Sequence, residues 1–472
     1  MLVGRREEIQ SLNEAFQGKS SEFIALFGRR RVGKTFLINE VYRDKILFSH
    51  TGIYGRTLSY QLQAFYESLL GQGFNEFDKP KNWMEAFRIL KSVISKSTKK
   101  KKIIFLDELS WMDTPKSNFL TALEFFWNGW ANARHDVILV ICASSTSWMI
   151  NKVIHNKGGL HNRLTRQLFI SPFTLGECEE LCNANHIAMN RYQMLMCYMI
   201  MGGIPYYWSL LKKGKSLDQN IDEIFFGEKA QLKSEYKYLY ASLFKNPEQY
   251  MNIVEALGKH KTGMLRNELI DTLKVKNTGT ISDQLEELEQ CGFIRKYQEF
   301  DKKKKGSQYQ LIDNFTLFYF KFIEKGQSNP HFWSEAAHRP ATDSWAGIAF
   351  ERVCLQHIEQ IKNGLGIRGV ITNVHSWRCP ADPDNGINGS QIDLLIVRKD
   401  QIIDLCEMKY SSKPYMLKKI DNESIENKKS DLYEVTHTKY AIHTVMITPE
   451  GLKRNSYSDN IQAVITAEDL FS

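Results

Sequence analysis

The chain has 472 residues, more than a single hydrophobic core usually holds, so we expect roughly three to four domains. Its formal net charge of +8 favours polyanionic partners only weakly. The eight cysteines are scattered without a C-x-x-C pair, which argues against a disulfide-rich secreted class. No signal peptide and no apolar run of roughly 18 residues is visible, so we expect a soluble cytoplasmic protein with no membrane partner.

The first predicted strand, residues 23–27, runs into the pattern G-x-x-x-x-G-K-T at residues 28–35, and a helix is predicted to follow. Backbone N–H groups of such a loop surround phosphate oxygens, and the helix N-terminus favours anions. Lys34 would reach the β- and γ-phosphates, where it would be catalytic, and the Thr35 hydroxyl would bind Mg²⁺. The predicted nucleotide-binding residues here are Gly28, Arg29, Arg30, Arg31, Val32, Gly33, Lys34, Thr35 and Phe36.

A second buried strand within KKIIFLDEL, residues 101–109, ends in Asp107 and Glu108. In P-loop enzymes an acid at the first position holds the Mg²⁺ shell, and a following acid can polarise the attacking water. We therefore predict Asp107 as a metal ligand and Glu108 as the catalytic base. The alternative is an acidic pair that only caps a helix after a buried strand.

A third buried strand, DVILVICASS at residues 136–145, would place the Ser144 hydroxyl near the γ-phosphate. Further on, Arg163 and Arg166 are alternatives for the cation that phosphoryl transfer uses. Either arginine could equally be a surface residue. If Arg163 acts across a subunit boundary, the protein would be a homo-oligomer.

Three segments together resemble a known family: LVGRREE at residues 2–8, the adjacent Asp-Glu pair, and MGGIPYYW at residues 201–208. They resemble the AAA-type ATPase family found predominantly in archaea, close to the STAND class of signalling NTPases. The resemblance covers roughly residues 1–245 and implies ATP as the nucleotide. It also implies that Gly4, Arg5 and Glu8, and Gly203 and Pro205, flank the adenine. Spacing alone would make these glycines only turns.

Residues 249–297 predict three short helices and a strand, followed by a hairpin with lysines at its tip, residues 302–305. This is the order of a helix-turn-helix with a wing, which favours DNA binding. The third helix, however, carries acidic residues that repel phosphates, at Asp283, Glu286, Glu287 and Glu289. The wing lysines could contact a nucleic-acid backbone without reading sequence. The alternative is a spacer between domains with a solvated lysine turn.

In the last third, a helix is predicted over residues 344–361, with Glu351 within it, followed by the strands QIDLLIV and IIDLCEMK. Glu407 and Lys409 are two residues apart in a strand, so their side chains leave the same face. If the hairpin loop has an odd length, Asp393 joins them on that face. Two carboxylates so close favour a divalent cation between them, with oxygen ligands that suit Mg²⁺. The lysine can then orient an attacking water.

This pattern resembles the PD-(D/E)xK nuclease superfamily. The resemblance implies that Glu351 is the helical acid, Asp393 and Glu407 the metal ligands and Lys409 the catalytic lysine, with Gln391 as support. Glu351, Asp393, Glu407 and Lys409 would be the catalytic group. Ile392 stands where the named pattern has proline. The alternative is an acidic and basic pair on a solvated strand face.

Together these patterns predict a multidomain α/β protein: a P-loop NTPase α/β/α sandwich with a helical lid, a winged helix, and a C-terminal α/β domain like a restriction endonuclease. The predicted ranges are 1–175, 176–245, 246–326 and 327–472. We predict an ATPase with ATP and Mg²⁺ as cofactors that couples nucleotide state to a metal-dependent nuclease-like domain. Nucleic acid, with DNA favoured, is the predicted partner. The alternatives are an ATP-gated signalling switch whose C-terminal domain only binds a partner, and a DNA-binding regulator.

Overall fold

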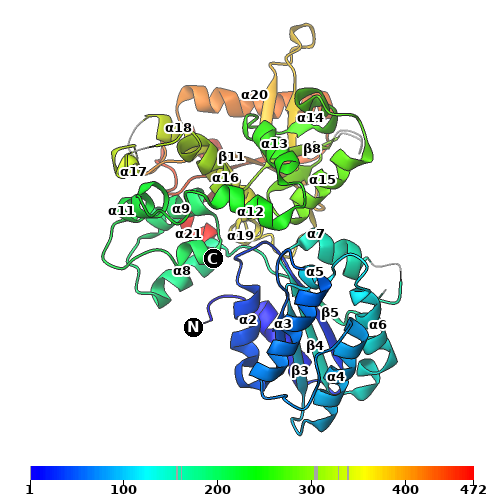
Figure 1. Ribbon diagram of the computed structural model, residues 1–472. Helices are drawn as coiled ribbons and strands as arrows, with labels where there is room; N and C mark the ends of the chain where they lie inside the picture. Colours follow the sequence, from blue (N-terminus) through cyan, green and yellow to red (C-terminus); the bar gives the residue numbers. More distant parts are fainter. Residues whose placement is uncertain (1, 156–157, 161, 302–306, 328, 337–339) are drawn as a thin grey trace. The chain divides into compact units, whose positions relative to one another are not determined.

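The computed structural model describes residues 2–155, 158–160, 162–301, 307–327, 329–336 and 340–472 (Figure 1). The chain divides into two compact units, residues 1–172 and residues 173–472. The wing tip predicted at residues 302–305 lies outside the described residues. Among the described residues, we find no helix with the length and apolar character that a bilayer crossing requires.

The first unit is built on a five-stranded parallel sheet in the order β2-β3-β4-β1-β5. The sheet explains the near-continuous apolar runs of the sequence, because a parallel sheet is covered on both faces. Every residue of β1, β3 and β4 is buried. The strands are β1 (Glu22–Phe27), β2 (Ile46–Thr51), β3 (Lys102–Asp107), β4 (Val137–Ala143) and β5 (Arg166–Phe169). The predicted parallel-sheet α/β fold of the P-loop domain is therefore confirmed.

Helices cover both faces of this sheet. One face packs against α3, α4 and α6 in a single aromatic-rich cluster that includes Phe23, Trp83 and Trp127. The buried side chains of α1 and α2, such as Leu12 and Ile38, lie outside that cluster. The helices are α1 (Arg6–Gln17), α2 (Lys34–Tyr42), α3 (Leu58–Gly71), α4 (Trp83–Lys96), α5 (Leu109–Met112), α6 (Phe119–Gly129) and α7 (Thr146–Trp148), with the short 3-10 helices η1 (Arg43–Lys45) and η2 (Ala131–Arg134) and the π-helix η3 (Met149–Ile154).

The second unit contains a mixed five-stranded sheet in the order β13-β12-β11-β10-β9. β9, β10 and β11 are antiparallel neighbours, whereas β11, β12 and β13 run parallel. The helix α20 (Lys419–Thr436) packs on this sheet through Ile425 and Leu432. The strands are β9 (Thr372–Cys379), β10 (Ser390–Arg398), β11 (Ile402–Met408), β12 (Ala441–Ile447) and β13 (Ala463–Ile465).

A smaller antiparallel sheet, in the order β6-β8-β7, lies in the same region as three helices, α13, α14 and α15. The three helices and the later strands β7 and β8 come in the order predicted for the winged helix, but the short strand β6 between α13 and α14 was not predicted. The apolar face of α15 is buried at Ile281, Leu285 and Leu288 as expected. Its assignment to that fold stays a prediction. The elements are α13 (Pro247–Gly258), β6 (Met264–Leu265), α14 (Arg266–Leu273), α15 (Gly279–Gln290), β7 (Ile294–Tyr297) and β8 (Gln308–Leu311). We call residues 246–326 the connector.

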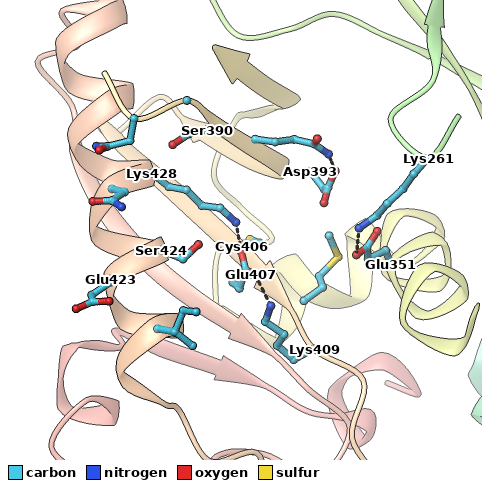
Figure 2. Close-up of a pocket in the computed structure, with 16 residues that line it drawn as sticks. Lys261, Glu351, Ser390, Asp393, Cys406, Glu407, Lys409, Glu423, Ser424 and Lys428 are labelled. Carbon is cyan, nitrogen blue, oxygen red and sulfur yellow. Dashed lines mark hydrogen bonds and ion pairs between the residues drawn. The ribbon is translucent and has the colours of Figure 1, made fainter. Parts of the chain in front are cut away.

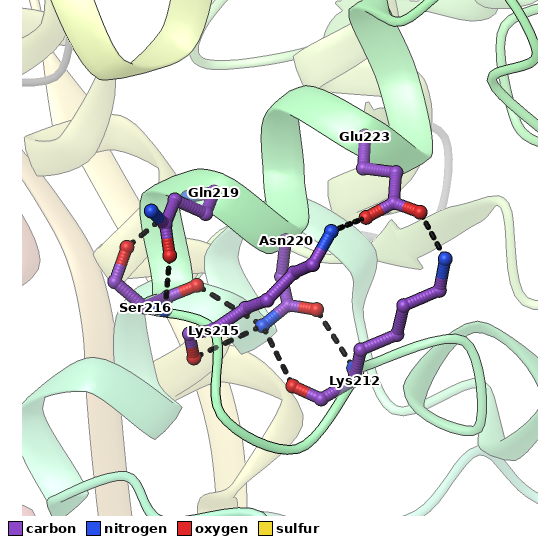
Figure 3. A network of polar contacts seen from close by, with 6 residues as sticks. All are labelled: Lys212, Lys215, Ser216, Gln219, Asn220 and Glu223. Carbon is purple, nitrogen blue, oxygen red and sulfur yellow. Dashed lines mark hydrogen bonds and ion pairs between the residues drawn. The ribbon is translucent and has the colours of Figure 1, made fainter.

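The remaining helices of the second unit frame these two sheets. They are α8 (Leu175–Ala184), α9 (Arg191–Met201), α10 (Pro205–Trp208), α11 (Leu217–Ile221), α12 (Glu235–Leu243), α16 (Asn314–Phe318), α17 (Phe332–Ala336), α18 (Pro340–Gln356), α19 (Ile358–Gly364), α20 (Lys419–Thr436) and α21 (Ala467–Leu470), with η4 (Asp222–Phe226), η6 (Tyr319–Ile323), η7 (Pro383–Asn385) and η8 (Ser458–Asn460). Figure 3 shows one polar network among them, in which the buried Asn220 side chain accepts a hydrogen bond from the Lys212 backbone and donates to carbonyls of the same loop. The network fixes the loop that leads into α11.

Within the second unit, polar contacts join the connector and the C-terminal sheet to the helices of residues 173–245, which we call the helical region. Asn314 donates to the Tyr198 carbonyl at 3.0 Å, and Asp222 accepts from the Trp333 backbone N–H at 2.7 Å. Arg378 of β9 pairs with the buried Glu299 of the connector at 2.8 Å. The four predicted domain ranges stay a prediction, but residues 173–472 pack as one compact unit.

The single helix predicted over residues 344–361 is interrupted, because α18 ends at Gln356 and α19 begins at Ile358. His357 lies at the break and is fully buried. Its Nε2 accepts a hydrogen bond from the Leu175 backbone N–H at 3.0 Å, and its Nδ1 lies 2.8 Å from the Val353 carbonyl. The tautomer with hydrogen on Nδ1 satisfies both contacts, so His357 joins α8 to α18 as a neutral ring.

Acid should weaken the second unit through His357. Burial lowers the pKa of this ring to about 4, with the Val353 carbonyl opposing the shift. Because the folded pKa lies below the unfolded value of about 6.5, the stabilisation is present above that pH and is lost as pH falls toward 4. The loss should reach about 3 kcal/mol in the free energy of unfolding.

Denaturant unfolding between pH 7 and 4 would measure this for the native chain and for His357→Gln. The variant should lose this component of the pH dependence, whereas His437→Asn, at an exposed histidine in a left-handed position that asparagine tolerates, should keep it. An unchanged acid profile in His357→Gln would contradict the assignment.

Candidate functional site

The loop between β1 and α2 has the backbone shape that a phosphate cradle requires. Gly28 has φ of +141°, and a Cβ there would lie 2.4 Å from the Ile170 carbonyl oxygen, so only glycine fits. Gly33 has φ of +90° and lies in open space directly before α2. The loop therefore ends at a helix N-terminus with glycine at both turns, as the pattern predicted.

The two functional side chains at the start of α2 contact the loop and the neighbouring strand end. The Lys34 ammonium donates to the Gly28 and Arg29 carbonyls at 2.8 and 2.9 Å. The Thr35 hydroxyl donates to the Asp107 carboxylate at 2.7 Å. A hydroxyl and a carboxylate in contact are an oxygen donor set that suits Mg²⁺, so the residues present fit the predicted metal.

Asp107 is the last residue of β3, and Glu108 follows it with a left-handed backbone at φ of 51°. This turn aims its carboxylate at Ser144, whose backbone N–H donates at 3.0 Å and whose hydroxyl also donates. Burial raises the pKa of Glu108, and the Ser144 hydrogen bonds oppose that rise. Ser144 thus lies against the predicted base and positions it.

Arg5 is buried with a left-handed backbone at φ of 57°. Its guanidinium donates to the Val32 carbonyl of the loop at 3.2 Å and to the Ser171 carbonyl at 2.6 Å. Glu8 lies 3.5 Å from the same guanidinium. Arg5 therefore supports the phosphate loop from behind, and Gly4, at φ of 63°, makes the turn before it.

The other predicted nucleotide contacts lie in different places. Phe36 is half-exposed, while Val32 is buried. Arg163 is exposed near the start of β5. Arg166 pairs with Glu14 and Glu22 at the amino ends of the parallel strands, opposite to the end that carries the loop, and so is no candidate for phosphate. Arg30 and Arg31 lie in the loop itself, and Gly203 and Pro205 lie in the second unit at the start of α10.

The second candidate site lies on the β10–β11 hairpin. Its loop has an odd number of residues between the paired strands, and the register pairs Leu394 with Cys406. Asp393 therefore lies opposite Glu407, one step further along. Together with Glu351 from α18 and Lys409, these residues line one pocket of about 570 Å³ (Figure 2).

Each acid of this pocket has a defined partner. The Glu407 carboxylate accepts from Lys409 at 3.0 Å and from Lys428 at 2.7 Å. Burial raises the pKa of Glu407, but the ammonium groups of Lys428 and Lys409 outweigh it, so the pKa is lowered overall. Gln391, the predicted supporting group, donates to Asp393 at 2.7 Å.

Glu351 meets a lysine of the connector. Its Oε1 accepts from Lys261 at 2.8 Å, while its Oε2 is buried without a hydrogen-bond partner among the described residues. Burial and the charge of Asp393 raise the pKa of Glu351.

Among the described residues, no three His, Cys, Asp or Glu side chains are arranged closely enough to hold a metal ion. The carboxylate oxygens of Asp393, Glu407 and Glu351 are nevertheless the donor type that Mg²⁺ takes.

Sequence reasoning missed Lys261 and Lys428 in this pocket. Lys428 shares a face of α20 with Ser424 and Asn427, at helical spacing, so a search for polar residues at that spacing could have found it. Lys261 lies 90 residues before its partner Glu351, and no local pattern points to it.

The acidic face of α15 is partly engaged within the connector, since Glu287 accepts a hydrogen bond from the Tyr250 hydroxyl and Glu289 accepts one from the Lys296 backbone N–H.

Comparison with known proteins covers the first part of the chain most clearly. Residues 2–211 match the protein family described as "ATPase domain predominantly from Archaea". An uncharacterised protein of Methanocaldococcus jannaschii is 29% identical over 331 residues, which make up 68% of this chain and 69% of that protein. An uncharacterised ATP-binding protein of the same organism is 42% identical over 45 residues, or 10% of this chain and 76% of that protein.

Two solved structures are similar at 14% identity. The Walker-type ATPase of Pyrococcus abyssi has a TM-score of 0.47 and covers 67% of this chain and 95% of its own. The ORC2 protein of Aeropyrum pernix, in ADPNP and ADP complexes, has a TM-score of 0.40 and covers 75% and 95%. The family match, the loop and the strand-end acids together identify residues 2–211 as an archaeal-type P-loop ATPase domain, a class that binds and hydrolyses ATP.

The close approach of Gly28 to Ile170 predicts a specific loss. Gly28→Ala should weaken ATP binding by about tenfold or more, because a Cβ would displace the loop and the φ value is unfavourable for alanine. Calorimetric titration with ATP would measure it. Gly71→Ala, at the end of α3 with nothing within 4 Å of the added Cβ, is the matched control and should bind normally. Equal affinity in the two variants would contradict the steric argument.

Proposed function

We propose that this protein uses ATP to control a metal-dependent nuclease-type site that acts on nucleic acid, with DNA favoured as the substrate. The observation that carries the proposal is the juxtaposition of Asp393 and Glu407 on paired strands, with Lys409 3.0 Å from Glu407 and Glu351 in the same pocket. A solvated surface pair would be exposed, whereas the Glu407 carboxylate is largely buried in a pocket that also holds a second acidic strand residue. Burial of charge without a function is costly, which favours a working site.

In the ATPase domain, Lys34 would bind the β- and γ-phosphates, and Thr35 with Asp107 would hold Mg²⁺. Glu108 would accept a proton from the attacking water. Its raised pKa supports this role, because a base is most effective when its pKa approaches the working pH. Ser144 holds the carboxylate in place and thereby fixes its direction.

In the C-terminal pocket, the carboxylates of Asp393 and Glu407 would hold a divalent cation whose remaining ligands would be water, and Glu351 lines the same pocket. When bound, such a cation supplies Lewis-acid stabilisation of charge on a phosphodiester. Lys409, which contacts Glu407, would orient the water that attacks phosphorus. Gln391 would keep the Asp393 carboxylate directed into the pocket through its 2.7 Å hydrogen bond.

Control by ATP is proposed to act on the second unit as a whole. The helical region, the connector and the C-terminal sheet share buried polar contacts through His357, Asn314 and Glu299. A nucleotide-dependent change would therefore move the connector and the pocket together. The predicted homo-oligomer, with Arg163 acting on a neighbouring subunit, belongs to this proposal as the route by which ATP turnover would be stimulated.

Glu108→Gln should leave ATP binding intact and reduce ATP hydrolysis about 100-fold or more, because the amide cannot accept the proton. Steady-state phosphate release and calorimetric ATP affinity would separate the two effects. In the native protein the ionised carboxylate of Glu108 is the active form, and its pKa is raised. As the pH is lowered, the hydrolysis rate should therefore begin to fall at a higher pH than it would with a glutamate of ordinary pKa. Hydrolysis that survives in Glu108→Gln would rule out this base.

Cleavage of supercoiled and single-stranded DNA with Mg²⁺ or Mn²⁺, with and without ATP, tests the nuclease assignment. Lys409→Ala should abolish cleavage, whereas Lys413→Ala, at an exposed lysine in the following loop, should retain it. Lys34→Ala should remove the dependence on ATP. If the native protein hydrolyses ATP but cuts no DNA, the nuclease-type site is wrong and an ATP-gated signalling switch is the better description.

A further inference from the structure

Three lysines from three different elements surround the acids of the C-terminal pocket, and only Lys409 belongs to the sequence pattern (Figure 2). Lys428 from α20 contacts one oxygen of Glu407 at 2.7 Å, and Lys409 contacts the other at 3.0 Å. Lys261, from the connector segment between α13 and β6, contacts Glu351 at 2.8 Å. Both oxygens of Glu407 and one oxygen of Glu351 are therefore occupied by ammonium groups.

The charges that line the pocket nearly cancel. Four acids, Glu351, Asp393, Glu407 and Glu423, face three lysines. The ammonium groups of Lys428 and Lys409 lie on either side of the Glu407 carboxylate, at 2.7 and 3.0 Å. A divalent cation that approaches these carboxylates must compete with ammonium groups already paired to them.

We propose that Lys428 and Lys261 exchange partners during binding: they neutralise Glu407 and Glu351 before a divalent cation binds, and are released to bind backbone phosphates of the nucleic acid when it does. This inference rests on the proposed function of the same pocket and deepens it. It assigns two further phosphate-binding residues. It also makes metal and nucleic acid bind cooperatively, because the metal frees the lysines to bind phosphates, and the phosphates draw the lysines away from the carboxylates that bind the metal.

The positions of the two lysines suit this exchange. The Lys428 side chain is 17% exposed, and the Lys261 side chain is 43% exposed. Both are long, unbranched chains whose ammonium can swing to a new partner. The Lys261 backbone is held firmly, because its carbonyl accepts from Gln310 at 2.7 Å and from the buried Arg352 at 2.5 Å. The side chain can therefore change partner without moving the connector.

The chain offers a matched control for each lysine. Lys429 follows Lys428 on α20 and pairs with Glu426 at 3.1 Å, outside the pocket lining. Lys259 precedes Lys261 by two residues and pairs with Glu255 at 2.8 Å, also outside this pocket. Each control removes the same charge from the same element without touching the carboxylates of the site.

The experiment measures Mn²⁺ binding to the full chain by the paramagnetic resonance of free Mn²⁺, with and without a short DNA duplex, and DNA affinity by fluorescence anisotropy. Binding that disappears in Asp393→Asn defines the contribution of this pocket. Lys428→Ala and Lys261→Ala should each bind Mn²⁺ about threefold or more tightly without DNA, because a competing cation is gone. The same variants should bind DNA more weakly and show less enhancement of Mn²⁺ binding by DNA.

Opposite changes in the two affinities distinguish exchange from a structural role, in which both would fall together. The proposal is overturned if Lys428→Ala weakens Mn²⁺ binding, if Lys429→Ala and Lys259→Ala change the affinities equally, or if DNA leaves Mn²⁺ binding by the native chain unaltered. Absence of any Asp393-dependent Mn²⁺ binding would overturn both this inference and the proposed metal site. If Mn²⁺ and DNA bind cooperatively but gel electrophoresis shows that the DNA is not cut, the exchange is supported and the nuclease assignment is wrong.

Discussion

A carboxylate taken out of water needs a cation or hydrogen-bond donors beside it, and this requirement organises much of the second unit. Glu299 is buried in the connector and is matched by Arg378 of β9 and by Gln308. Asp222 is buried beside α11 and is matched by the backbone at the start of α17. These partners come from distant parts of the sequence, so satisfying each acid brings separate segments together.

The same requirement separates the two functional regions. Glu108 is satisfied locally, because Glu108 follows β3 and Ser144 follows the adjacent parallel strand β4, so both lie at the same edge of the sheet. Glu407 and Glu351 are satisfied by lysines from α20 and the connector. The ATPase acid thus depends on the sheet alone, whereas the C-terminal acids depend on how three elements pack against one another. A substitution of Lys261 in the connector should therefore affect the pocket, although Lys261 lies 90 residues before Glu351 in the sequence.

Local patterns predicted what local geometry determines. The glycines of the loop, the acids at the end of β3 and the opposition of Asp393 to Glu407 follow from turn, strand and hairpin geometry over a few residues. The break in the helix at His357 could not be predicted from local patterns. Its ring accepts a hydrogen bond from the backbone N–H of Leu175, 182 residues away in the sequence, and no proline or glycine marks the position. Lys261 was missed for the same reason, since its partner Glu351 is set by tertiary packing, whereas the helical spacing of Lys428 with Ser424 and Asn427 is a local signal.

Arg5 connects two backbone segments that are far apart in the sequence, the phosphate loop and the end of the first unit. Its guanidinium donates hydrogen bonds to the carbonyl of Val32 in the phosphate loop and to the carbonyl of Ser171, the next-to-last residue of the first unit. Beside it, Ile170 donates its N–H to Phe27 at 2.7 Å and lies against Gly28. The last residues of the first unit are thus hydrogen-bonded, through Arg5, to the loop that would respond to phosphate. Because one side chain contacts both backbones, a displacement of the loop at Val32 would be felt at Ser171 through Arg5 without passing through the sheet.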